Sequence, residues 1–182
     1  MKRAFIFLAN GFEELEAIAP IDILRRADIP VITVSVSDSK MVTGAHNVTL
    51  VADQLFSETD FSDNAILILP GGGVGTKNLA AHKQLNELLL RQFEKNKNLA
   101  AICAAPSVFG NLGLLAGKEA VCYPGFEEKL VGADIPDQQV VKSDNIITAR
   151  GAGVAVPFAL KIVETLKGAE LAHQIAKQII FE

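Results

Sequence analysis

The chain has 182 residues, 49% of them hydrophobic and 21% charged, with a formal net charge of −4 at pH 7. This length and balance predict one globular domain, residues 1–182, and the acidic charge argues against partners such as nucleic acid or an anionic membrane surface. Two cysteines and three histidines argue against a disulfide framework or a multi-cysteine zinc site, and no apolar run approaches the ~20 residues of a membrane span, so a reducing cytoplasm is the expected location.

Short apolar strands alternate with helical patterns along the chain. The first apolar run, residues 4–8, is too short for a signal peptide and has no cleavage site after it, so it is predicted to be a buried strand. Further strands are predicted at 31–36, 65–69 and 99–103, and helices at 14–26, 78–95, from Pro106 to about 114, 156–167 and 170–179, the last two separated by Gly168.

Shorter patterns lie between these elements. Residues 43–51 and those near Leu55 are predicted to form an antiparallel segment outside the main alternation. Residues 120–122 are predicted to form a short strand. Residues 140–142 and 146–149 are predicted to pair as a hairpin around residues 143–145. Apolar strands that alternate with helices favour an α/β fold with a mostly parallel sheet covered by helices on both faces.

Three glutamates follow the first strand, in residues 10–16. Glu13 and Glu14 fit the negative charge that a helix N-terminus favours. Glu16 differs because it enters the apolar part of the helix. Beside a thiolate, a carboxyl there would be pushed toward its protonated form and could donate a hydrogen bond or carry a proton.

A glycine loop, Pro70-Gly71-Gly72-Gly73-Val74-Gly75, follows the 65–69 strand. It fits neither the Walker nor the dinucleotide-binding pattern. A plain tight turn is one interpretation. The other is an oxyanion hole in which the N–H groups of Gly71 and Gly72 converge with that of Ala104.

Cys103 stands where the apolar run 99–102 meets Ala104 and Ala105, with Pro106 in the first turn of a helix. A thiol at a strand's carboxyl edge and a helix's positive end is expected to have a pKa lowered toward neutrality, which makes it a nucleophile. The arrangement is that of a nucleophile elbow. The alternative is an inert core thiol, a common state of free cysteines.

The remaining candidates carry weaker signals. Tyr123, the only tyrosine, is either a half-buried aromatic or a hydrogen-bond donor over the site. Residues 149–153 fit a helix-entry turn better than an incomplete dinucleotide fingerprint. His46, His82 and His173 have no local catalytic partner, and a surface or structural place is expected for each, with His82 solvated at a helix start.

Taken together, these segments resemble the ThiJ/PfpI superfamily, and within it the parkinsonism-associated protein deglycase (ThiJ-like) branch. The matching segments are residues 9–16, 20–22, 25–27, 69–72, 100–106 and 150–153. The resemblance implies a flavodoxin-like three-layer sandwich and a homodimer, and we expect neither a cofactor nor a metal. It also implies that Cys103 is the reactive cysteine, Glu16 the acid that hydrogen-bonds its sulfur, and Gly71, Gly72 and Ala104 the backbone donors around it.

Two further positions are compared with this branch. His46 falls where the branch carries a basic residue near the dimer-side mouth of the site. Tyr123 stands where members often place a histidine near the cysteine. Because a tyrosine, with a pKa near ~10, is a poor base at neutral pH, proton transfer would fall to Glu16 and peptidase activity is disfavoured.

Two functions are therefore expected from one site. The first is a cofactor-independent enzyme that acts on reactive dicarbonyls such as methylglyoxal, or on their protein adducts, with Cys103, Glu16 and Tyr123 in the catalytic set. The second is a non-enzymatic oxidative-stress sensor or chaperone that works through oxidation of Cys103. Thiazole monophosphate biosynthesis and amidotransferase- or peptidase-like activity rank below both.

Overall fold

The computed structural model describes residues 2–181. A seven-stranded sheet runs in the order β5-β2-β1-β6-β7-β9-β8, and its only antiparallel pair within the described residues joins β8 to β9. Its strands are β1 (Arg3–Leu8), β2 (Val31–Ser35), β5 (Gln54–Leu55), β6 (Asn64–Leu69), β7 (Asn98–Ile102), β8 (Val140–Ser143) and β9 (Ile146–Ala149). A separate antiparallel hairpin is formed by β3 (Met41–Thr43) and β4 (Thr49–Val51).

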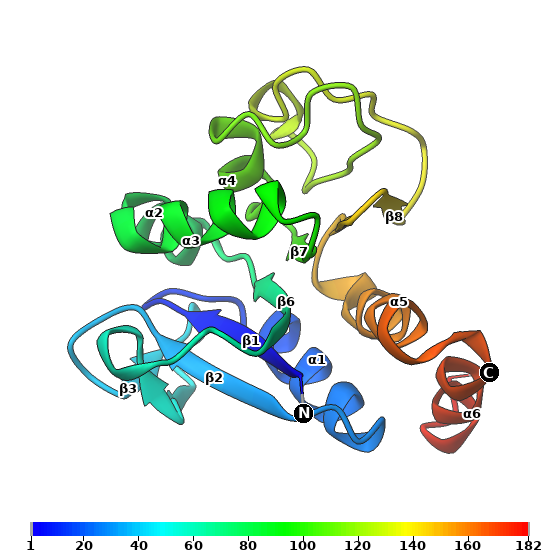
Figure 1. Cartoon of the computed structure of the whole chain (residues 1–182), viewed down its shortest axis with the longest axis horizontal. Helices are drawn as coiled ribbons and strands as arrows, with labels where there is room; N and C mark the ends of the chain where they lie inside the picture. The colour runs from blue at the N-terminus through cyan, green and yellow to red at the C-terminus, as the bar shows by residue number, and fades with distance from the viewer. Residues whose placement is uncertain (1, 182) are drawn as a thin grey trace.

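Helices cover both faces of the sheet (Figure 1). One face carries α1 (Glu14–Arg26), α5 (Ala155–Lys167) and α6 (Ala169–Gln178), and the other carries α2 (Gly73–Ala81), α3 (Lys83–Glu94) and α4 (Pro106–Asn111). Both faces need this cover because the side chains of residues 4–8 in β1 are all apolar and point alternately to opposite sides. Ala4, Ile6 and Leu8 enter one core, whereas Phe5 and Phe7 enter the other. The predicted α/β sandwich with a mostly parallel sheet is confirmed. No helix within residues 2–181 is both long and apolar enough to cross a membrane.

The single helix predicted over 78–95 is wrong. The chain forms two helices, starting at Gly73 and breaking at His82, whose backbone is extended at φ −82° and ψ 96°. The His82 side chain is the reason: its Nδ1 accepts a hydrogen bond from the N–H of Leu85 at 3.0 Å and so caps α3. The ring also lies against Phe56, with centroids 4.6 Å apart, so His82 is half-buried rather than solvated.

Other predicted boundaries hold or shift for local reasons. Leu55 does not belong to the antiparallel hairpin, because it pairs in parallel with Ser35 at the sheet edge. Residues 120–122 form no strand, since the N–H of Val121 donates to the Thr148 hydroxyl. The helix after Pro106 ends at Asn111, shortly before Gly113 at φ 73°. The hairpin of β8 and β9 and the separation of α5 from α6 at Gly168 are confirmed.

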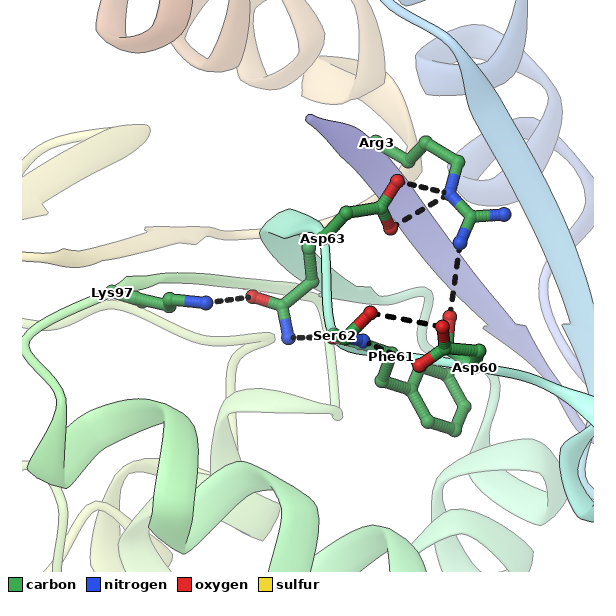
Figure 2. Close-up of polar contacts among 7 residues, drawn as sticks. Arg3, Asp60, Phe61, Ser62, Asp63 and Lys97 are labelled. Atoms are coloured by element: carbon green, nitrogen blue, oxygen red, sulfur yellow. Dashed lines mark hydrogen bonds and ion pairs between the residues drawn. The ribbon is translucent and has the colours of Figure 1, made fainter. Parts of the chain in front are cut away.

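Polar contacts hold the start of β6 against β1 (Figure 2). Arg3 Nε donates to both carboxylate oxygens of Asp63 at 2.8 and 2.9 Å, and Arg3 Nη2 donates to the carbonyl of Asp60 at 3.0 Å. Lys97 Nζ donates to Asn64 Oδ1 at 3.2 Å, which links β6 to the start of β7. These contacts lie at the amino edge of the central strands and help to fix their order.

The chain order of the sheet reverses at β1, which lies between β2 and β6. In open α/β sheets, ligands bind outside the carboxyl ends of the strands at such a switch point. The loops that follow β1, β6 and β7 meet there, and they carry the glutamates, the glycine loop and Cys103.

Candidate active site

Cys103 occupies a strained turn between β7 and α4. Its φ is 64°, a left-handed value that costs a non-glycine residue roughly 1–3 kcal/mol and persists only where surrounding contacts enforce it. Those contacts are on both sides: the N–H of Cys103 donates to the Ala149 carbonyl at 2.9 Å, and its carbonyl accepts from the N–H of Tyr123 at 2.8 Å. The side chain is half-buried, so the elbow presents the thiol at the edge of the sheet.

The backbone donors around the thiol differ in part from the predicted set. The N–H groups of Gly72 and Ala104 hydrogen-bond to the Cys103 sulfur. The N–H of Gly71 instead donates to Oε2 of Glu16 at 2.9 Å. Gly71 therefore holds the acid, not the sulfur, and the prediction that all three N–H groups converge on one atom is wrong for Gly71.

Glu16 reaches the thiol from the first turn of α1. The helix is capped by Glu13, whose Oε2 accepts from the N–H of Glu16 at 2.8 Å. The Glu16 side chain is 0% exposed and lies within hydrogen-bonding reach of the Cys103 thiol. Its Oε1 accepts no hydrogen bond from any described residue. The predicted pairing of this acid with the cysteine is thus present in the structure.

The two groups shift each other's protonation. Burial raises the pKa of Glu16 to about 7, against the hydrogen bonds from Cys103 and Gly71, which lower it. Burial, together with the charge of Glu16, raises the pKa of Cys103 to about 12. The expectation of a thiol pKa lowered by main-chain dipoles is therefore wrong when Glu16 is ionised, because the donors Gly72 and Ala104 are outweighed.

The pair behaves as one unit that loses its first proton near pH 7 and keeps its second proton to a much higher pH. Two negative charges side by side in a buried site are unfavourable, so loss of the second proton is delayed. The nucleophilic form is the one in which Glu16 holds the proton and donates it in a hydrogen bond to the thiolate.

The glycine loop can lie this close only because it lacks side chains at the contact. Gly72 has φ 89°, and a Cβ there would collide with the carbonyl oxygen of Gly11 and stand 2.8 Å from the backbone nitrogen of Glu13. A Cβ on Gly71 would stand 2.6 Å from Glu16 Oε2 and 2.7 Å from Cys103 Cβ. The loop can therefore pack its backbone directly against the β1–α1 connection and beside the site.

Tyr123 is beside the cysteine through its backbone, but its side chain is 51% exposed. Its ring lies over Gly151, where a Cβ would come within 3.3 Å of Cδ2. Within residues 2–181 its hydroxyl makes no hydrogen bond to protein, so donation to a substrate stays a prediction. The predicted helix-entry turn after β9 is confirmed as a 3-10 turn, η3 (Ala152–Val154), directly before α5.

His46 has a partner that sequence reasoning missed. Its Nδ1 lies 2.9 Å from Glu14 Oε2 and its N–H donates to Glu14 Oε1 at 2.7 Å. Burial raises the pKa of Glu14, but the hydrogen bonds from His46 outweigh it and lower that pKa overall, while the hydrogen bond to Glu14 raises the pKa of His46. No local pattern signals this contact, because the two residues are 32 positions apart.

The same residues are the one candidate metal-ligand group found among residues 2–181. Glu13, Glu14 and His46 each offer an atom, all within 4.8 Å of one another. Glu14 and His46 already hydrogen-bond to each other, which accounts for their placement without an ion.

The chain is similar to known proteins along most of its length. A family model described as the DJ-1/PfpI family matches residues 2–165. The protein DJ-1 homolog B of Arabidopsis thaliana is 39% identical over 171 residues, which cover 93% of this chain but 39% of that longer protein. The glutathione-independent glyoxalase DJ-1 of Schizosaccharomyces pombe is 30% identical over 189 residues, which cover 98% of both chains.

The fold is shared with solved structures of the same group. The structure of oxidized Toxoplasma gondii DJ-1 matches with a TM-score of 0.95 and 34% identity, over 99% of this chain and 98% of that one.

Proposed function

This chain belongs to the DJ-1/PfpI family, and we propose that it is a cofactor-independent glyoxalase- or deglycase-type enzyme that works as a homodimer on reactive dicarbonyls such as methylglyoxal or their protein adducts. The observation that carries the proposal is the buried Glu16 carboxyl, hydrogen-bonded to the Cys103 thiol and raised to a pKa of about 7. An acid with that pKa both gives and takes protons at neutral pH. The Schizosaccharomyces pombe relative, named a glyoxalase, supports the same reaction class.

The reaction begins with addition to the aldehyde. The Cys103 thiolate forms a C–S bond to the aldehyde carbon, and the carbonyl π pair moves to oxygen. The developing oxyanion faces the N–H groups of Gly72 and Ala104, the two groups that hydrogen-bond to the sulfur. Glu16 then gives its proton to that oxygen, which leaves a neutral hemithioacetal and a Glu16 carboxylate.

Glu16 next moves a proton between adjacent carbons. Its carboxylate removes the C–H proton of the former aldehyde carbon, and the electron pair moves onto the ketone oxygen to give an enediolate. Glu16 returns this proton to the neighbouring former ketone carbon, while the hydroxyl proton of the sulfur-bearing carbon passes to the former ketone oxygen. The product is a thioester of a 2-hydroxy acid on Cys103. Water adds to the thioester carbonyl, the C–S bond breaks, and lactate and the free thiol are released when the substrate is methylglyoxal.

The sequence of steps balances within the substrate. The aldehyde carbon is oxidised to the level of a carboxylic acid while the ketone carbon is reduced to an alcohol, and only water is consumed. No external oxidant, reductant or metal is needed, in line with the expectation from the sequence that no cofactor is used.

An exposed apolar surface supports the homodimer. On α1, Leu15 and Ile18 are exposed, and so are Met41 and Val51, which pair across the hairpin of β3 and β4, and Val48 beside them. Glu14 ties this hairpin to α1, since its Oε1 accepts from the N–H groups of His46 and Val48. Contiguous exposed apolar residues mark association surfaces, and a second copy of the chain would cover them.

The test of the reaction is methylglyoxal turnover to lactate by the wild type and by two matched variants. Cys103→Ser should lower turnover by at least about 10³-fold, because a serine hydroxyl lacks an adjacent strong base. Cys122→Ser makes the same chemical change at a cysteine that is buried outside the site and should leave turnover within a few-fold of the wild type. Turnover that survives Cys103→Ser would refute the enzyme.

The turnover experiment also distinguishes the enzyme from the second candidate function, an oxidative-stress sensor. The sulfur lies beside the Glu16 carboxyl and two N–H donors, an arrangement that could hold a sulfinate oxygen by hydrogen bonds. A wild-type protein without turnover, whose Cys103 gains two oxygens in mild peroxide by mass spectrometry, would support the oxidative-stress sensor instead.

A further inference from the structure

A cavity of about 450 Å³ lies between α2, α4 and the 3-10 turn η2 (Glu127–Lys129). Its lining includes Val74, Lys77 and Ala80 of α2, Asn111 of α4, and Phe126 and Lys129. Neither Cys103 nor Glu16 lines it, although both of its helices begin directly after loops of the candidate active site (Figure 1). The volume is in the range of small-molecule sites.

The walls of this α2–α4 cavity have one sign of charge. Lys77 and Lys129 are exposed at the rim, and no acidic residue lines the cavity. Neither lysine has an ion-pair partner among residues 2–181; the Lys129 ammonium lies 4.5 Å from the centroid of the Phe126 ring. Two ammonium groups without a counter-charge beside an apolar wall favour an anionic guest.

The remaining lining is apolar or offers hydrogen bonds. Val74, Ala80 and the half-buried ring of Phe126 supply apolar contact, and the amide of Asn111 lies at the rim. Thr76, which is 5% exposed, has a hydroxyl without any hydrogen-bond partner in the described chain. Because this hydroxyl is itself closed to solvent, the polar groups that a guest can reach are those of Lys77, Lys129 and Asn111.

From these features we propose that the α2–α4 cavity binds a small organic anion, a carboxylate carried on an apolar or aromatic body. The carboxylate lies between Lys77 and Lys129, and the body lies against Val74, Ala80 and Phe126. This binding is separate from the proposed reaction at Cys103 and does not depend on it.

The probe for the test is 3-phenylpropionate, with 3-phenylpropanamide as its uncharged counterpart. Both are titrated into the isotope-labelled full-length chain, up to about 10 mM, and followed by two-dimensional NMR. The carboxylate should shift amide signals in 73–81, 107–111 and 126–129, and should bind at least about fivefold more tightly than the amide. Equal binding of the two probes, shifts confined to other segments, or no shifts would each overturn the proposal.

Two double variants test whether Lys77 and Lys129 cause the preference for the carboxylate over the amide. The double variant Lys77→Gln with Lys129→Gln should bring the carboxylate to within about twofold of the amide, since both changes lie at exposed positions and leave the fold intact. The matched control, Lys83→Gln with Lys95→Gln, removes the same charge from exposed lysines outside the cavity and should keep the fivefold preference. A preference that survives the first variant, or is lost in the control, would contradict the assignment.

Discussion

At the scale of single residues, the chemistry depends on one proton shared by Glu16 and Cys103. Because the apparent titration belongs to the pair, loss of its first proton near pH 7 creates a population in which Glu16 keeps the remaining proton and the sulfur is a thiolate. The rate at which iodoacetamide alkylates Cys103 should therefore rise through about pH 7 and then level off. An increase that instead follows a free thiol, near pH 8.5, would contradict this coupling.

The matched variant is Glu16→Gln, which keeps the shape of the side chain but cannot carry the proton. Its alkylation profile should lose the step near pH 7 and rise at higher pH, because burial still raises the pKa of the thiol. Methylglyoxal turnover should fall by about 10²- to 10⁴-fold, the usual contribution of a general acid–base group. Circular dichroism of the variant checks that the fold is retained.

Much of this site could be predicted from sequence, since a cysteine after an apolar strand, an acid inside an apolar helix turn and glycines at a strand end are local patterns. What could not be predicted is how the groups share their bonds. The N–H of Gly71 turns to Glu16, and the charge of Glu16 opposes ionisation of Cys103. Both effects depend on distances between segments that are far apart in the chain.

At the scale of elements, the break between α2 and α3 depends on His82 acting as an N-cap. His82→Ala should destabilise the protein by about 1 kcal/mol, and His82→Asn should recover most of that loss because asparagine is a good cap. Chemical denaturation at neutral pH measures both.

The His82 cap should also depend on pH. Burial lowers the pKa of His82, and Nδ1 can accept from Leu85 only while it is unprotonated. The stabilisation is therefore present above the unfolded-state pKa of about 6.5 and is lost as pH falls through the lower folded-state value. The stability difference between the wild type and His82→Ala should shrink on acidification; a constant difference would argue against the cap.

The helix prediction failed here for a physical reason. The apolar spacing of Leu79, Leu85, Leu88 and Leu89 continues across the break, so periodicity alone sees one helix. The break depends on the hydrogen bond between the His82 side chain and the N–H of Leu85, and on the contact of His82 with Phe56. The spacing of apolar residues carries no information about either contact. The central strands were predictable because each is a short apolar run.

At the scale of the whole molecule, the exposed apolar surface of α1 and the β3–β4 hairpin is the proposed dimer contact. Val51→Asp places a charge at a position that is 72% exposed in the single chain and should shift the protein from dimer to monomer. Val131→Asp makes the same change at a position 62% exposed outside this surface and should leave the dimer intact. Sedimentation equilibrium of both variants decides; an unchanged mass for Val51→Asp, or a wild-type monomer, contradicts the contact.

The meeting of three loops at the switch point has a consequence for how reactivity arises during folding. Acid, donors and sulfur come from the segments after β1, β6 and β7, and no continuous stretch shorter than 16–104 contains them all. In a nascent or fragmented chain, Cys103 is therefore expected to react like any free cysteine. Its altered reactivity begins only once β1, β6 and β7 have paired in the sheet. The reactivity of the Cys103 thiol therefore reports whether the polypeptide has reached its native state.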